Sequence, residues 1–156
     1  MRGGSTEEAL KCAIKYLGYR ARSEEEVRVK LTQLGFPEKS IKATLERLRL
    51  LKVLNDEDFA RGWALSRAKG REYGPLRIER DLRQKGISRS LIRSILEEAF
   101  AEQGETEGAK RLLEKKFSGK DMSDKKVIRR AAAFLQRFGY HHTVIEELLG
   151  QSLRDG

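Results

Sequence analysis

One pattern of residues occurs three times along this chain of 156 residues. It has the form Leu-x-x-x-Gly, then an aromatic residue or Ile, then x-x-x-x-Ile-x-x-x-Leu, and it begins at residues 31, 82 and 135. The glycines of the three copies, which lie 51 and then 53 residues apart, are Gly35, Gly86 and Gly139. A fixed period of about 50 residues is typical of repeat proteins. We therefore expect three small units whose joint surface carries the function.

Each copy of the pattern predicts two helices joined by a turn. Apolar residues recur at helical spacing, the strict alternation of a strand is absent, and each glycine fits the left-handed position just after a helix. Helix starts are also legible, because Ser5 and Ser23 each precede a glutamate by three residues, Asn55 precedes three acids, and Pro75 fits a first helical position. Helices are predicted over residues 6–19, 24–34, 37–51, 56–69, 75–85, 89–102, 107–117, 124–138 and 142–150.

The predicted fold class is all-α, with three tandem three-helix, helix-turn-helix-like repeats in an elongated array. Apolar residues make up 38% of the chain and charged residues 37%, which favours three thin cores over one thick core. The predicted domains are residues 1–55, 56–104 and 105–156. The third copy matches the other two least well. Hinges are expected at residues 51–54 and 101–105.

The net charge of +9 and the pI of about 9.8 indicate a polyanionic partner, either nucleic acid or an acidic protein surface. The alternative is a highly charged protein without such a partner. The single cysteine, Cys12, excludes an internal disulfide and a cysteine-rich metal site. There is no long apolar run and no signal-peptide pattern, so we expect no membrane span and a cytoplasmic location.

The segment 75–85 places its arginines on one side of a predicted helix. At about 100° per residue, Arg77, Arg80 and Arg83 fall within an arc of roughly 120°, opposite Ile78 and Leu82. An ordinary solvated basic face is the alternative. Because the arginine fork suits carboxylate and phosphate equally, the ligand stays open. Together with similar residues of the third repeat, the predicted partner-binding or DNA-binding residues are Arg77, Arg80, Arg83, Lys85, Arg89, Arg93, Lys126, Arg130 and Arg137.

Tyrosines are the candidates for stacking on nucleic-acid bases. Tyr73 lies beside Gly74 in a basic linker, and we expect it to be the best exposed of the four tyrosines. Phe36, Phe59, Phe138 and the single tryptophan, Trp63, lie on apolar stripes and are predicted to be core residues.

No catalytic constellation is found, so the chain is predicted not to be an enzyme and to need no cofactor or metal. His141 and His142 are adjacent, point to different faces of a helix and make a poor metal pair. Residues 55–58 resemble the start of a calcium loop but lack its glycine and distal glutamate, so they are interpreted as a helix cap. No glycine-rich loop that could cradle phosphates occurs.

Several strings in the middle of the chain, taken in order, resemble the RecX family, bacterial regulators of the RecA recombinase. They are Arg-Ser-Glu-Glu-Glu at 22–26, Leu-Gly-Phe at 34–36, Val-Leu-Asn-Asp-Glu-Asp-Phe-Ala at 53–60, Gly-Pro-Leu-Arg-Ile at 74–78 and Leu-Arg-Gln-Lys-Gly-Ile at 82–87. The resemblance covers about residues 9–149. Asn55 stands where the family usually has Asp, and both residues can cap a helix.

The resemblance implies a curved, elongated molecule that lies in the groove of the RecA filament on DNA. Such a protein inhibits ATP hydrolysis and strand exchange, promotes filament disassembly and acts in DNA recombination, repair and the SOS response. The RecA filament is thus the expected partner, with single- and double-stranded DNA as further candidates. Two alternatives stay open, a helix-turn-helix DNA-binding protein and a helical scaffold for another acidic partner. No long apolar stripe is left over, which favours a monomer.

Overall fold

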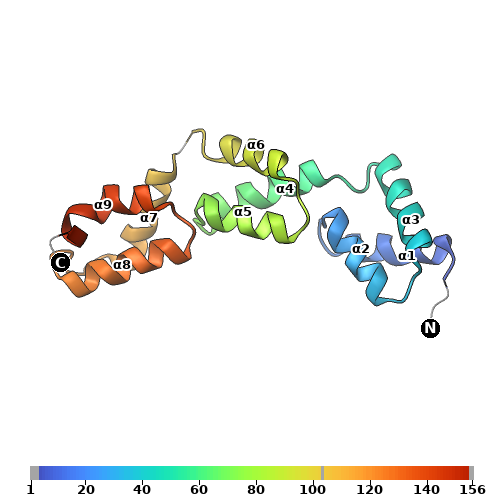
Figure 1. Ribbon diagram of the computed structural model, residues 1–156, viewed down its shortest axis with the longest axis horizontal. Helices are drawn as coiled ribbons and strands as arrows, with labels where there is room; N and C mark the ends of the chain where they lie inside the picture. The colour runs from blue at the N-terminus through green and yellow to red at the C-terminus, as the bar shows by residue number, and fades with distance from the viewer. Residues whose placement is uncertain (1–3, 103, 155–156) are drawn as a thin grey trace.

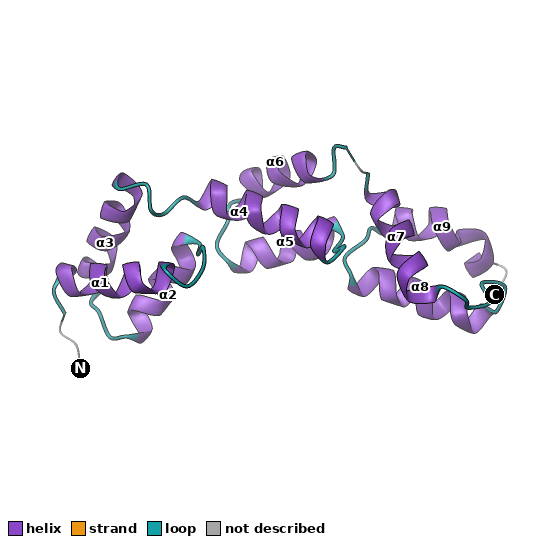
Figure 2. Cartoon of the chain, turned by 180° about the vertical axis from the view of Figure 1, so that it is seen from behind, coloured by secondary structure: helices purple, strands orange, loops and turns teal. Residues whose placement is uncertain are grey.

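The computed structural model describes residues 4–102 and 104–154, and all regular structure in this part of the chain is helical (Figure 2). The all-α prediction is confirmed. The outer limits of the predicted domains, residues 1 and 156, lie outside the described residues. The helices are α1 (Thr6–Leu17), α2 (Glu24–Gln33), α3 (Glu38–Leu50), α4 (Asp56–Leu65), the π-helical turn η1 (Ser66–Gly70), α5 (Pro75–Gln84), α6 (Arg89–Ala99), α7 (Glu105–Phe117), α8 (Lys125–Arg137) and α9 (His142–Arg154).

The helices gather into three groups that follow one another along the long axis of the molecule (Figure 1). Each group has a core of its own, built by α1 to α3, by α4 to α6 with η1, and by α7 to α9. The leucine that opens each copy of the repeated pattern is completely buried in its core, as Leu31, Leu82 and Leu135. Because each of the three cores is small, the few apolar residues of the chain are enough to fill them.

Helix starts follow the predicted capping. Ser23 and Glu26 form a complete capping box, Ser5 accepts from the Glu8 N–H, and the Asn55 side chain accepts from the Asp58 N–H at 3.1 Å. Most boundaries lie within three residues of the prediction, and the two largest differences are at the ends of the fourth and ninth helices. The fourth helix ends in a wider π-helical turn, and α9 runs four residues further, to Arg154. No helix among the described residues is long and apolar enough to cross a bilayer.

The same turn follows the second helix of every group. Gly35, Gly86 and Gly139 have φ values of 88°, 79° and 97°, which L side chains rarely adopt. The N–H after each glycine donates to the carbonyl of the leucine five residues earlier, at 3.1, 3.0 and 3.1 Å. This bond satisfies a carbonyl that the helix end leaves without a partner. The left-handed glycines predicted from the sequence are confirmed.

The turn of each later group rests on the start of the second helix of the group before it. At the first junction Gly86 lies against Glu25, and the Asp56 carboxylate accepts from the Glu24 N–H at 2.8 Å. At the second junction the turn before α9 lies against the start of α5. There the N–H groups of residues 74 and 76 donate to the carbonyls of residues 138 and 139, at 2.6 and 2.9 Å. Consequently α2, α5 and α8 lie along one long edge, and α3, α6 and α9 along the other (Figures 1 and 2).

A lysine occupies the left-handed position after α3. Lys52 has a φ of 59°, and the Val53 N–H donates to the Leu48 carbonyl at 3.0 Å, as in the three glycine turns. We expect Lys52→Gly to raise the free energy of unfolding by about 1 kcal/mol, because glycine adopts this conformation without steric cost. Urea denaturation measures the effect. Lys42→Gly, in the middle of the same helix, is the control and should lower stability. A less stable Lys52→Gly variant contradicts the argument.

The second junction depends on a glycine with ordinary backbone angles. A Cβ atom at Gly74 would lie 2.5 Å from the carbonyl carbon and oxygen of Gly139. We expect Gly74→Ala to lower the free energy of unfolding by about 1–3 kcal/mol, because the turn before α9 must move away and loses its backbone hydrogen bonds. Gly70→Ala is the matched control, since a Cβ there meets no atom within 4 Å. Equal stability of the two variants in urea denaturation argues against this close contact.

Candidate partner-binding surface

The arginines of α5 point in three directions rather than to one face. Arg83 lines a cleft toward α6, Arg80 is exposed, and the Arg77 backbone and Cβ lie against Gly139 of the third group. The helical periodicity gave the core-facing side correctly, since Ile78 and Leu82 are completely buried. Different neighbouring elements lie against different parts of the opposite side of α5, so the three arginines do not form a single contact face.

Arg77 is part of the junction between the second and third groups. Its guanidinium lies 3.8 Å from the centre of the Tyr73 ring and 5.6 Å from that of Phe138. The side chain is half-buried, and its buried Nε has no acceptor among the described residues. Arg77 therefore packs one group against the next. Its predicted role in binding a partner stays a prediction.

Tyr73 is not the best exposed tyrosine, contrary to the expectation from its linker position. It is half-buried against the second core, with the Phe138 ring edge-on at 5.6 Å and the Arg77 guanidinium over its face. Tyr19 has the most exposed aromatic side chain, at 75%. A base could reach the Tyr73 face only by displacing Arg77.

Lys85 is engaged within the chain at the first junction. Its Nζ lies 3.2 Å from the Glu26 carboxylate and 4.5 Å from the centre of the Trp63 ring. Burial alone would raise the pKa of Glu26, but the Ser23 N–H, Arg20 and Lys85 together hold it below its ordinary value. Lys85 thus joins the first group to the second, and its predicted role in partner binding stays a prediction.

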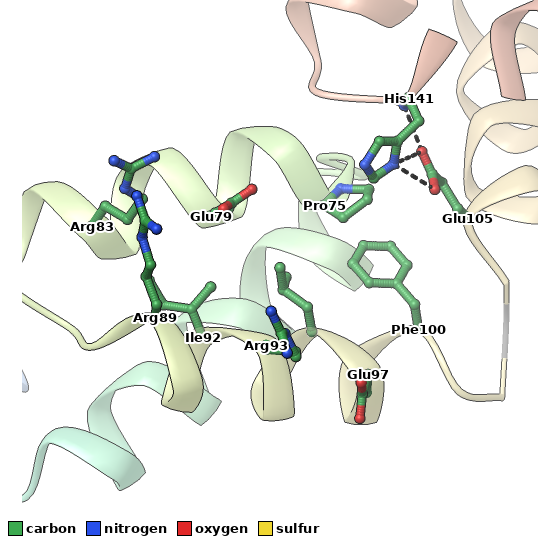
Figure 3. Close-up of a pocket in the computed structure, with 11 residues that line it drawn as sticks. Pro75, Glu79, Arg83, Arg89, Ile92, Arg93, Glu97, Phe100, Glu105 and His141 are labelled. Atoms are coloured by element: carbon green, nitrogen blue, oxygen red, sulfur yellow. Dashed lines mark hydrogen bonds and ion pairs between the residues drawn. The ribbon is translucent and has the colours of Figure 1, made fainter. Parts of the chain in front are cut away.

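Three of the predicted arginines do gather at one place. Arg83 from α5 and Arg89 and Arg93 from α6 line a cleft of about 500 Å³ between the two helices, and none of them forms an ion pair with a described residue (Figure 3). Because no carboxylate neutralises these guanidinium groups, they remain available to an acidic partner.

The cleft also has apolar and acidic walls. Ile92, Leu96 and Phe100 provide its apolar surface, and Glu79 and Glu97 add negative charge (Figure 3). Such a mixture of arginine, aromatic and apolar side chains is typical of protein–protein contacts, whereas a phosphate-binding groove carries positive charge nearly throughout.

The third group closes one end of the cleft. The Glu105 carboxylate accepts from the His141 N–H at 2.6 Å and lies 3.0 Å from His141 Nδ1 (Figure 3). His142 contacts a different carboxylate, that of Glu146, at 3.1 Å. The two histidines therefore diverge. Among the described residues no group of three or more His, Cys, Asp or Glu side chains could hold a metal ion.

The predicted basic residues of α8 lie on its outer side. Ile128, Ala131 and Leu135 are buried in the third core. The predicted basic residues Lys126, Arg130 and Arg137 are exposed and form no ion pair with a described residue. We call the exposed predicted cations of the three helices the basic surface. It comprises Arg80, Arg83, Arg89, Arg93, Lys126, Arg130 and Arg137.

Sequence reasoning missed the residues that complete the cleft. Phe100 ends α6, Glu105 begins α7, and His141 precedes α9, so only the packing of the third group against the second brings them together. No local pattern signals this arrangement.

Comparisons with known proteins place these features in a family. Sequence models of the first and second RecX three-helix domains match residues 9–48 and 55–96. A regulatory protein RecX of Mycobacterium sp. (strain JLS) is 35% identical over 95% of this chain and 86% of its own length. The RecX proteins of Prosthecochloris aestuarii and Bacillus velezensis are 39% and 31% identical over 63% and 96% of this chain. The aligned part spans only 65% and 57% of those two relatives.

Solved structures show the same fold. The crystal structure of a regulatory protein RecX superposes with a TM-score of 0.77 at 25% identity, covering 94% of this chain and 71% of the other. RecX from Lactobacillus salivarius superposes with a TM-score of 0.72 at 22% identity, covering 94% and 96%. With two family domains matched in order and a relative aligned over nearly the whole chain, this chain belongs to the RecX family of regulatory proteins.

Proposed function

We propose that this chain regulates the RecA recombinase by lying lengthwise in the groove of the RecA–DNA filament, where it inhibits ATP hydrolysis and strand exchange. The observation that carries the proposal is the basic surface, whose seven exposed side chains have no acidic partner among the described residues. They are distributed over α5, α6 and α8 of an elongated row (Figure 1). Charge spread along such a row suits a long anionic groove better than a single compact site.

The proposed mechanism is bridging. Three groups joined by packed junctions span neighbouring subunits of the filament and hold them in a state that does not close for hydrolysis or admit a second duplex. The cleft between α5 and α6 receives an acidic protein segment, because its arginines can bind carboxylates in a bidentate manner while its apolar wall buries aliphatic or aromatic atoms. The arginines and lysine of α8 contact acidic protein or phosphate.

The chain itself carries out no chemistry in this proposal. It acts in the cytoplasm on a partner that hydrolyses ATP, and it needs no cofactor or metal. Single- and double-stranded DNA are secondary partners that contribute phosphate contacts. A sequence-specific DNA-binding protein usually concentrates its base-reading residues on one recognition helix. The distribution of the basic surface over three helices argues against that alternative.

The first test compares two titrations at one salt concentration. We expect the chain to inhibit the single-stranded-DNA-dependent ATPase of RecA at concentrations at least tenfold below those needed to coat the same naked DNA, because filament contacts add to phosphate contacts. ATP hydrolysis and fluorescence anisotropy of labelled DNA are the measurements. Inhibition only at coating concentrations identifies a DNA-binding competitor. An absence of inhibition leaves a helical scaffold for another partner.

The second test reverses charge on the basic surface. We expect Arg80→Glu, Arg83→Glu and Arg93→Glu combined to raise the half-inhibitory concentration by about tenfold or more, because each reversal turns an attraction into a repulsion. Circular dichroism should show unchanged helix content, since all three side chains are exposed.

The matched control changes the same net charge elsewhere. Lys39→Glu, Lys42→Glu and Arg47→Glu lie on the exposed side of α3 and have no ion-pair partner among the described residues. This control should inhibit like the parent chain. If both triple variants lose inhibition equally, total charge rather than the basic surface determines binding.

A further inference from the structure

A second cleft lies at the junction between the first and second groups, apart from the basic surface. Its volume is about 480 Å³. One wall comes from the loop between α1 and α2, a second from the link between α3 and α4, and a third from α4 and η1. It therefore collects side chains from both groups and from the segment that joins them.

Two arginines from different walls of this cleft lie over aromatic rings. The Arg22 guanidinium lies 4.0 Å from the centre of the Tyr16 ring, and that of Arg67 lies 3.7 Å from the centre of the Trp63 ring. Stacking restrains a guanidinium without using its N–H groups, which point outward from its edge. Both arginines are thus oriented in advance for an acceptor that approaches in the plane of the guanidinium.

The cleft has more positive charge than its own carboxylates can neutralise. Arg22, Arg67 and Lys52 form no ion pair with any described residue. The one lining acid, Asp58, has a side chain that is 77% exposed and lies 3.7 Å from Arg61. An anion bound here would meet three cations that no described carboxylate pairs with, although Arg67 also donates to the Ser66 hydroxyl at 3.3 Å.

Two residues that line the cleft have a buried hydrogen-bond donor without an acceptor. The Nε atoms of Arg22 and Trp63, the latter named Nε1, are buried and have no acceptor among the described residues. A buried donor without an acceptor costs on the order of 1–3 kcal/mol in general, so such groups are rare in folded proteins. Two such donors among the residues that line one cleft are a second sign that an acceptor is missing in this region.

The third sign is the backbone of Lys52. It holds a left-handed conformation that Gly35, Gly86 and Gly139 occupy at the other turns of this kind. A lysine in this conformation has a steric cost that a glycine would not have. In return, a cationic side chain without an ion-pair partner lines the cleft. Strained residues of this kind cluster at binding sites.

We propose that this cleft binds a phosphate group through Arg22, Lys52 and Arg67. A phosphate presents several acceptor oxygens in a tetrahedral arrangement, which suits donors that converge from different walls. Its source is the backbone of a nucleic-acid strand or free phosphate. Because the three cations belong to the first group, the link and the second group, the bound phosphate ties the two groups together. The proposal does not depend on the RecA filament.

Trp63 provides the measurement, because it is the only tryptophan of the chain and Arg67 lies on its ring. The full chain is titrated with inorganic phosphate and, in a parallel arm, with a single-stranded oligonucleotide. Sodium chloride at matched ionic strength is the reference. We expect saturable changes in Trp63 fluorescence and a rise in the thermal unfolding midpoint. Tighter binding of the oligonucleotide identifies a strand as the source, whereas equal or tighter binding of inorganic phosphate identifies the free ion.

Three variants separate the site from general charge. Arg22→Gln and Arg67→Gln should each lower the affinity for the ligand about tenfold, and the ligand should therefore raise the unfolding midpoint of these variants less. Lys52→Gly should unfold at a higher temperature without ligand yet bind it more weakly, a combination that a purely structural lysine does not give. Arg47→Gln, an exposed arginine outside the cleft, should bind like the parent chain.

The opposite results are equally clear. If neither phosphate nor the oligonucleotide differs from chloride, the cleft is not a phosphate site. If Arg47→Gln loses as much affinity as Arg22→Gln, the response belongs to total charge and the assignment is wrong. RecA is absent from these measurements, so their failure leaves the proposed regulatory function untouched, and the reverse also holds.

Discussion

The architecture depends on a left-handed glycine that serves two purposes at once. Gly86 and Gly139 end a helix with a backbone conformation that L side chains rarely adopt, and each lies so close to the preceding group that a Cβ atom would overlap it. The same residue thus stops the second helix and seats its turn on the group before. Gly35 shares the backbone conformation and ends α2 in the same way. At Gly86 and Gly139 these two requirements fall on one residue, so a larger side chain there would disturb both the helix end and the junction.

Some charged side chains form ion pairs within the chain, and others face solvent without an ion-pair partner. Lys85 with Glu26 and Arg49 with Glu24 fasten elements together, and Lys115 lies 2.7 Å from the nearly buried Glu72 at the second junction. Charge at the junctions compensates for small cores, since each group buries few large side chains. The seven cations of the basic surface form no ion pair with a described carboxylate, and this surplus, rather than the total of +9, describes what a partner meets.

Local rules were enough to predict the helices. Capping serines, Asn55, Pro75 and the left-handed glycines act within a few residues, so their effects can be read from the sequence. The candidate surface was predicted only in part. Helical periodicity identifies the side of a helix that faces its own core, but it carries no information on which other group packs against the remaining sides. Arg77 and Lys85 both satisfied the periodicity and both belong to junctions. The prediction that Tyr73 is exposed was wrong for the same reason, because the Phe138 ring that packs against it comes from 65 residues further along the chain.

The start of α8 differs from those of its counterparts. Helices α2 and α5 begin seven residues before the leucine of the repeated pattern, whereas α8 begins ten residues before it, at Lys125. Where the first two groups offer a helix start that receives the next turn, the third presents nearly one additional helical turn with exposed lysines. Any group placed beyond α8 therefore needs a different joint.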